Sequence, residues 1–190
     1  MAQENCITDN KCEREYDFAL IIDGVPELTE KVENALFEAG CDDATFSIQY
    51  GHLYAEFSRP APSFEEAILS AIRQVRKALP GVVILRVDEC NLVTPSEIAR
   101  RINRTRQAVH QYINGTRGPG NFPPPECQLT DGAPLYAWCA VSYWLAENNI
   151  IRPEEGWNAE VVAIINATLE VIRRQDRHPG LVRQVEEVLA

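Results

Sequence analysis

Residues 93–115 read VTPSEIARRINRTRQAVHQYING, a stretch that contains the start and end signals of two short helices. Thr94-Pro95-Ser96-Glu97 has the form of a capping box with proline in the first turn, which predicts that a helix begins there. Asn103 tolerates the left-handed conformation that a tight turn needs, and Thr105 predicts the N-cap of a second helix that runs to Asn114. Two helices joined by a turn of about three residues form a helix-turn-helix unit.

The two predicted helices each have an apolar and a polar side. Ile98, Ala99 and Ile102 form the buried edge of the first helix, and Ala108, Val109, Tyr112 and Ile113 that of the second. The polar side carries residue types that read DNA, because Arg pairs with guanine or phosphate and Gln with adenine. The candidate DNA-binding residues are Ser96, Arg100, Arg101, Arg104, Thr105, Arg106, Gln107, His110, Gln111, Arg117 and Asn121. Two helices of a small bundle with polar outer faces remain the alternative interpretation.

The charge of the chain is divided into blocks. Its 190 residues carry 18 Lys and Arg against 28 Asp and Glu, a formal net charge of −10. Residues 91–125 hold 5 Arg against Glu97 alone, a net charge of +4, whereas residues 1–90 carry −9 and residues 126–190 carry −5. A surface that binds phosphate is therefore expected in the central block. A solvated, Arg-rich helix face is the alternative interpretation of this charge.

The segment 93–115, with Asn121-Phe-Pro-Pro-Pro and Pro134-Leu-Tyr-Ala-Trp, resembles bacterial winged helix-turn-helix regulators of the MerR and excisionase-like kind. The resemblance covers residues 91–148 and implies a recognition helix, an F-P-x-P loop, a hairpin wing, a Trp-containing helix and binding to double-stranded DNA. The chain lacks the long C-terminal coiled coil with metal-binding cysteines of MerR activators, so metal sensing is not implied. It differs from bare excisionases in its acidic N-terminal domain.

A hairpin wing is also predicted from local signals. Cys127–Thr130 and Ala133–Tyr136 flank Asp131-Gly132, a dipeptide that suits a type I′ turn. The three prolines at 123–125 stiffen the approach to this hairpin. They are expected to hold Arg117 and Asn121 near a phosphate or the minor groove. A proline-rich ligand of an SH3 domain is the alternative interpretation of the three prolines.

Residues 16–90 show alternating strand and helix signals. Period-two alternation predicts strands at 16–23, 46–50 and 53–57, helical spacing predicts helices at 28–39 and 63–79, and an apolar run predicts a strand at 82–87. This order matches the ferredoxin-like βαββαβ arrangement, a fold that says little about activity. Its RNA-reading version uses aromatic residues on a basic strand, whereas residues 52–58 are acidic or neutral.

The last segment is predicted to form a long helix and a short one. The long helix has a wide apolar face formed by Trp157, Val161, Ile164, Ile165, Thr168, Leu169 and Ile172. The short helix follows the break at Pro179-Gly180 and is lined by Val182, Val185, Val188 and Leu189. Such a face docks on its own chain or pairs with a second copy. Because one small helix-turn-helix makes few DNA contacts, we expect a homodimer with Ile165 and Leu169 in the contact.

Several functional classes lack support in the sequence. No stretch approaches the roughly 20 apolar residues of a membrane span, and residues 1–10 are polar and acidic, unlike a secretory signal. The six cysteines, at positions 6, 12, 41, 90, 127 and 139, show no C-x-x-C spacing. We therefore expect reduced cytosolic thiols in preference to a disulfide framework, and no metal site. His52, His110 and His178 have no catalytic context, so neither an enzyme nor a cofactor is expected.

The sequence thus predicts an α+β chain: a flexible N-terminus (1–15), a ferredoxin-like domain (16–90), a mostly helical winged helix-turn-helix (91–148) and C-terminal helices (149–190). The expected function is that of a cytoplasmic, sequence-specific DNA-binding protein, a bacterial transcriptional regulator that binds double-stranded DNA as a homodimer. The alternative is an interaction protein, such as an antitoxin or a phage-associated adaptor. In that case the acidic N-terminal domain binds a protein partner and DNA binding serves autoregulation.

Overall fold

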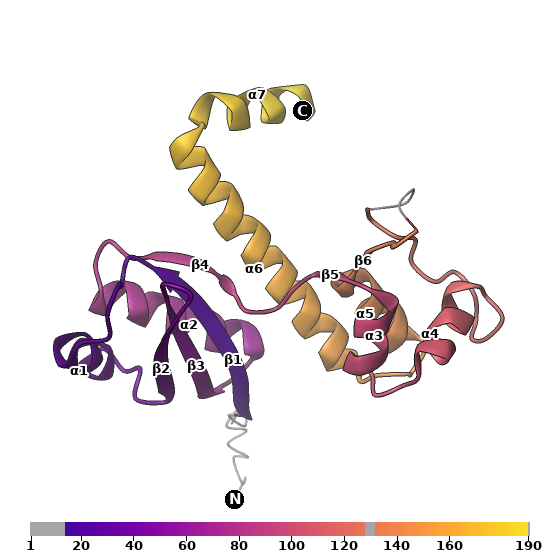
Figure 1. The fold of residues 1–190 in the computed structure, drawn as a ribbon, viewed down its shortest axis with the longest axis horizontal. Helices are drawn as coiled ribbons and strands as arrows, with labels where there is room; N and C mark the ends of the chain where they lie inside the picture. Colours follow the sequence, from indigo (N-terminus) through magenta and orange to yellow (C-terminus); the bar gives the residue numbers. More distant parts are fainter. Residues whose placement is uncertain (1–13, 128–131, 190) are drawn as a thin grey trace, which may run out of the picture. The chain divides into compact units, whose positions relative to one another are not determined.

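A computed structural model describes residues 14–127 and 132–189 of the chain (Figure 1). These residues form a mixed α+β structure with a four-stranded antiparallel sheet, a two-stranded sheet and seven helices. Contacts divide the chain into two compact units, Met1–Ile84 and Leu85–Ala190. The predicted limits at residues 90 and 148 remain predictions, and the predicted flexible N-terminus falls almost wholly outside the described residues.

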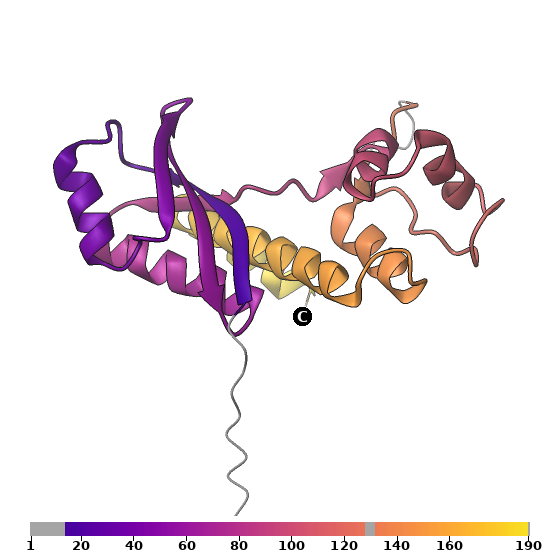
Figure 2. The same cartoon turned by 90° about the horizontal axis from the view of Figure 1, so that it is seen from below.

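The N-terminal unit contains strands and helices where the hydrophobic periodicity places them. They are β1 (Arg14–Asp23), α1 (Glu30–Glu38), β2 (Ala44–Gln49), β3 (His52–Ala61), α2 (Phe64–Ala78) and the start of β4 (Val83–Val87). The order of strands in the sheet is β2-β3-β1-β4. Figure 2 shows α1 and α2 on the same side of this sheet.

Strand register explains why one side of the sheet takes the helices. Leu20 of β1 lies opposite Ala55 of β3, and Phe18 lies opposite Phe57 with the two rings stacked. Apart from Arg59, the buried residues of this parity are apolar, and they point together toward α2, whose buried stripe includes Ile68 and packs on them. Both helices begin at side-chain caps of the expected kind, the hydroxyls of Thr29 and Ser63.

The C-terminal unit is mostly helical. Its elements are β5 (Leu92–Val93), α3 (Pro95–Arg101), α4 (Arg106–Ile113), β6 (Tyr136–Ala137), α5 (Trp138–Glu147), α6 (Pro153–Arg177) and α7 (Pro179–Leu189). The two helices predicted from residues 93–115 are therefore confirmed. Of the predicted wing, an antiparallel bridge between Cys127 and Leu135 is described. Of the predicted turn Asp131-Gly132, Gly132 is described, whereas Asp131 and the end of the first arm at 128–130 lie outside the described residues.

The core of the C-terminal unit joins α3, α4, α5 and the start of α6. Its buried residues are Val93, Ile98, Ala99, Val109, Tyr112, Tyr136, Trp138, Val141, Trp144, Leu145 and Ala159. The helices α5 and α6 approach closely at Gly156, where an added Cβ would lie 3.0 Å from the Cβ of Ala146. None of the helices in the described part of the chain has the length and hydropathy needed to cross a bilayer.

A charged pair lies in the interior of the N-terminal unit. Arg59 projects from β3 among apolar residues and is 5% exposed. Its Nε and Nη2 donate to the two carboxylate oxygens of Asp43 at 2.7 and 2.8 Å, Nη1 donates to Ser70, and Nη2 also donates to the carbonyl of Gly40. Burial by itself lowers the pKa of Arg59, but the hydrogen bonds and charge of Asp43 outweigh it and raise that pKa. The guanidinium therefore stays charged inside the unit.

Replacing Asp43 with Ala should lower the free energy of unfolding by about 3 kcal/mol, because Arg59 is then a buried charge without its counter-ion. The neighbouring Asp42→Ala variant, at an exposed position, should change it by less than about 0.5 kcal/mol. Urea titration followed by circular dichroism measures both values. Equal effects of the two variants would contradict the assigned role of the buried pair.

Candidate nucleic-acid interface

The helices α3 and α4 are fixed by the caps that the sequence predicts. The hydroxyl of Thr94 accepts a hydrogen bond from the backbone N–H of Glu97 at 3.2 Å, and that of Thr105 accepts one from Ala108 at 3.2 Å. Between the helices Asn103 has φ +50°, and the N–H of Arg104 donates to the carbonyl of Ala99 at 2.9 Å. The turn is therefore tight, and each helix starts at a defined residue.

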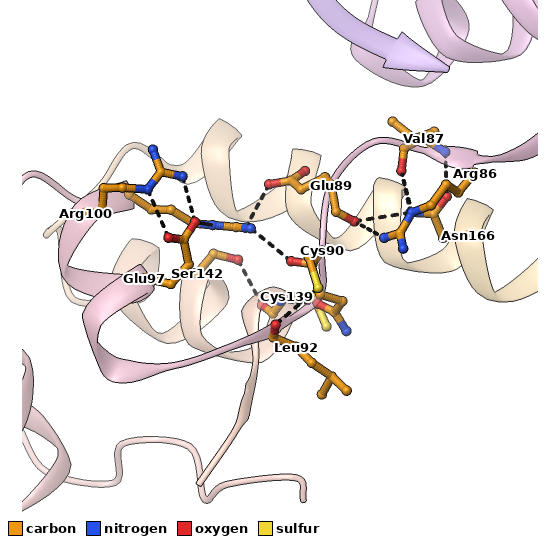
Figure 3. A network of polar contacts seen from close by, with 12 residues as sticks. Arg86, Val87, Glu89, Cys90, Leu92, Glu97, Arg100, Cys139, Ser142 and Asn166 are labelled. Atoms are coloured by element: carbon orange, nitrogen blue, oxygen red, sulfur yellow. Dashed lines mark hydrogen bonds and ion pairs between the residues drawn. The ribbon is translucent and has the colours of Figure 1, made fainter. Parts of the chain in front are cut away.

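Glu97 binds two arginines of its own helix. Its carboxylate accepts hydrogen bonds from Arg100 at 2.6 and 2.9 Å and from Nε of Arg101 at 3.1 Å (Figure 3). The hydrogen bonds and charge of Arg100, with a smaller contribution from Arg101, lower the pKa of Glu97 to about 2. The sequence predicted that this carboxylate reaches back to the cap; the contacts found for it are with the arginines.

Arg100 and Arg101 lie in different environments although they are adjacent. The side chain of Arg100 is 73% exposed, whereas that of Arg101 is 14% exposed. Besides Glu97, the guanidinium of Arg101 donates to the carboxylate of Glu89 and to the carbonyl of Cys90, both at 3.0 Å, and lies 4.8 Å from the ring centroid of Trp138. Arg101 thus links α3 to the segment before β5 and to the start of α5.

The segment from Arg86 to Asn91 is held from several sides (Figure 3). The side-chain amide of Asn166, on α6, accepts from the N–H of Val87 at 2.7 Å and donates to its carbonyl at 3.0 Å. Asn91 accepts the N–H of Cys139 with its side chain and that of Trp138 with its carbonyl, which satisfies two donors at the start of α5. This segment therefore ties α3, α5 and α6 together; we refer to residues 86–91 as the anchor segment.

Burial raises the pKa of Glu89, although the charge of Arg101 and a hydrogen bond from Trp138 act in the opposite direction. Glu89 is therefore a partly buried carboxylate, and Arg101 stabilises its negative charge. Loss of Arg101 would leave this carboxylate without its cation.

Most of the predicted DNA-binding residues are on the surface. Ser96, Arg100, Arg104, Thr105, Arg106, Gln107, His110, Arg117 and Asn121 are exposed, and Arg101 and Gln111 are half-buried. The inward side of α4 packs Ala108, Val109 and Tyr112 into the core, so helical geometry turns Arg106, Gln107 and His110 outward. Within residues 14–127 and 132–189, no hydrogen bond or ion pair holds the side chains of these three outward residues.

A cavity of about 370 Å³ lies beside the outward side of α4. It brings together Ser96 from the first turn of α3, Arg106 and His110 from α4, and the segment Gly132–Tyr136. Burial raises the pKa of Tyr136, so its hydroxyl stays protonated. The structure thus groups three predicted residues, Ser96, Arg106 and His110, around one concave surface, while Arg100, Arg117 and Asn121 do not line it.

The loop that follows α4 is packed against aromatic rings of the core. The indole of Trp144 donates to the carbonyl of Gly120 at 3.0 Å. Gly118 has φ +83°, and an added Cβ there would lie 3.4 Å from both Trp144 and Tyr112. The guanidinium of Arg117 lies 5.7 Å from the Tyr112 ring centroid. The loop therefore follows a fixed path, with Arg117 at the base of α4.

Sequence reasoning missed the residues of the anchor segment and their partners. Glu89 and Asn91 lie on either side of the predicted domain limit at residue 90, and Asn166 lies 79 residues from Val87, so no local periodicity relates them. No cluster of three metal-ligating side chains occurs among the residues that the structure describes.

Replacing Arg101 with Ala should lower the free energy of unfolding by about 3 kcal/mol, because Glu89 and Glu97 lose their shared cation in a partly buried site. Arg100→Ala, one residue away, removes an exposed partner and should cost less than about 1 kcal/mol. Thermal and urea unfolding of the two variants measure the difference. A cost for Arg100→Ala as large as that for Arg101→Ala would contradict the role given to Arg101.

The low pKa of Glu97 predicts a pH-dependent contribution to stability. A carboxyl whose pKa is lower in the folded chain stabilises the fold above its ordinary pKa of 4.5, and that contribution is lost as the pH falls toward about 2. The stability difference between the wild type and Glu97→Gln should therefore be constant near neutral pH and shrink below pH 4.5. Urea unfolding over a pH series tests this, and a difference that grows with acid would contradict it.

We compared the chain with protein-family models, curated proteins and solved structures. None of the three comparisons gives a match. The assignment of function therefore rests on the chain's own residues and their geometry.

Proposed function

We propose that this chain is a sequence-specific protein that binds double-stranded DNA, and that it acts as a bacterial transcriptional regulator. The observation that carries this proposal is the outward side of α4. It presents Arg106, Gln107 and His110 to solvent while the opposite side of the same helix is buried in the core. An exposed helix whose side chains are those that bind base edges suits the major groove.

Roles can be assigned to the arginines from their contacts. Arg101 is held by Glu89 and Glu97, so we assign it to the fold and not to DNA. Arg100 shares Glu97 but is exposed, which suits a phosphate contact by α3. Arg104 stands before α4 and Arg117 after it, so we assign both to contacts with the DNA backbone beside the groove. The net positive charge of residues 91–125 supports the same assignment.

We assign the winged helix-turn-helix arrangement to α3, α4 and the segment around the Cys127–Leu135 bridge. The cavity between α4 and Gly132–Tyr136 supports it, since a wing beside a recognition helix encloses such a concave surface. For the N-terminal unit we assign the ferredoxin-like arrangement, which the strand order and the two helices on one side of the sheet support. Residues 1–90 carry −9, so DNA binding is assigned to the C-terminal unit.

The test begins with selection of random duplexes by the full chain, followed by affinity measurements on the selected site. Gln107→Ala should relax the base preference at one position, and Arg106→Ala should weaken binding, each by about 1 to 3 kcal/mol. Arg104→Ala should weaken all duplexes alike and reduce the dependence on salt.

Arg73→Ala is the matched control, because it removes the same charge from an exposed position on α2. It should leave the affinity within about a factor of two, as expected for a charge outside the interface. Selection that yields no preferred sequence, or Arg106 and Gln107 variants that bind as the control does, would overturn the proposed function.

A further inference from the structure

An unpartnered apolar line runs along α6. Trp157, Ile164 and Val171 recur every seven residues and are 59%, 54% and 49% exposed. Ile165 and Leu169, which the sequence analysis placed in a dimer contact, are half-buried, so they belong to a different side of this helix. A repeat of seven residues is the spacing that keeps one line of side chains facing a second helix.

The helix α7 continues the apolar surface beyond the end of α6. Its apolar side chains Leu181, Val185 and Val188 lie at helical spacing and are 61%, 50% and 84% exposed. Among the described residues, no side chain of α7 is buried. An amphipathic helix gains little from folding on its own, because most of its stability comes from packing its apolar side.

The exposed apolar area has the size of a dimer interface. Burial of one aliphatic side chain removes on the order of 100 Å² of apolar surface, and the exposed large hydrophobics of α6 and α7 together contribute roughly 400 Å². A stable interface buries about 800 Å² on each partner, of which a little over half is apolar. An apolar patch of this size is about the largest that a typical monomer exposes, and such patches are often binding surfaces.

Charged residues beside the apolar line are arranged symmetrically. Glu160 precedes Ala167 by seven residues and Arg174 follows it by seven, so all three lie on one edge of the line. If two copies of α6 pair antiparallel about Ala167, each Glu160 faces the partner's Arg174, which in a single copy also donates to Glu170 of its own helix at 2.8 and 2.6 Å. The small side chain of Ala167 then allows the helices to approach on the axis. An interface between identical copies requires such self-complementarity.

We propose that two copies of this chain associate through α6, antiparallel about Ala167, with each α7 covering the partner's Trp157. The contact between α7 and Trp157 follows from this register. Trp157 lies opposite the end of the partner's α6, immediately before the partner's α7. The two α4 helices are then related by a two-fold axis. Resting on the proposed function, this predicts that the preferred DNA site is an inverted repeat.

The register is tested by charge reversal in the full chain. By analytical ultracentrifugation the wild type should be a dimer at micromolar concentration. Glu160→Arg and Arg174→Glu should each weaken it about tenfold, since two like-charge contacts arise in every dimer. The double variant restores opposite charges and should return the dissociation constant to within about threefold of the wild type. Lys77→Glu, at an exposed position on α2 outside the proposed interface, is the control and should leave the dissociation constant unchanged.

Ile164→Asp should give a monomer with an unchanged circular dichroism spectrum, because the wild-type side chain is half exposed in a single copy. This monomer should keep its affinity for a half-site and lose that for the inverted repeat. A wild type that stays monomeric at high micromolar concentration, or a double variant no better than the single ones, would overturn the proposed dimer. Half-site binding that persists in either case leaves the proposed function intact.

Discussion

The guanidinium of Arg101 is the interaction on which the C-terminal unit depends. Four groups from three parts of the chain surround it: the carboxylates of Glu89 and Glu97, the carbonyl of Cys90 and the ring of Trp138. A planar cation with five donors can satisfy such a set, whereas an ammonium group cannot match its geometry. The anchor segment, α3 and α5 all meet at this group, which adds to the links they share through the core and through Asn91.

Because Arg101 is engaged within the fold, the arginines that are accessible to a ligand are other ones. Glu97 neutralises part of the positive charge of α3, whereas Arg104 and Arg106, at the start of α4, are exposed. The division explains how a chain with a net charge of −10 can present a cationic surface. Glu89 and Glu97 serve packing at Arg101, whereas Arg104 and Arg106 stay on the surface.

Much of the local structure could be predicted because its causes are local. Thr94 and Thr105 are caps by chemistry and position, and the periodicity of residues 93–115 sets the buried sides of both helices. The role of Arg101 could not be predicted, since it depends on Glu89 and Trp138, which the fold and not the sequence brings near. Likewise, periodicity gave α6 an apolar face, but only packing shows that Ile165 is half-buried and Ile164 exposed.

The contact between Asn166 and Val87 has a consequence for how the chain is made. It joins residues 79 positions apart, and one side chain satisfies both backbone groups of Val87 at the end of β4. A chain leaving the ribosome has completed every strand of the four-stranded sheet long before Asn166 is synthesised. Until α6 emerges, the backbone groups of Val87 at the end of β4 therefore lack the hydrogen bonds that Asn166 later supplies. A chain that terminates before residue 166 lacks the side chain that satisfies both backbone groups of Val87, and these groups at the end of an edge strand are then free to pair with a foreign strand.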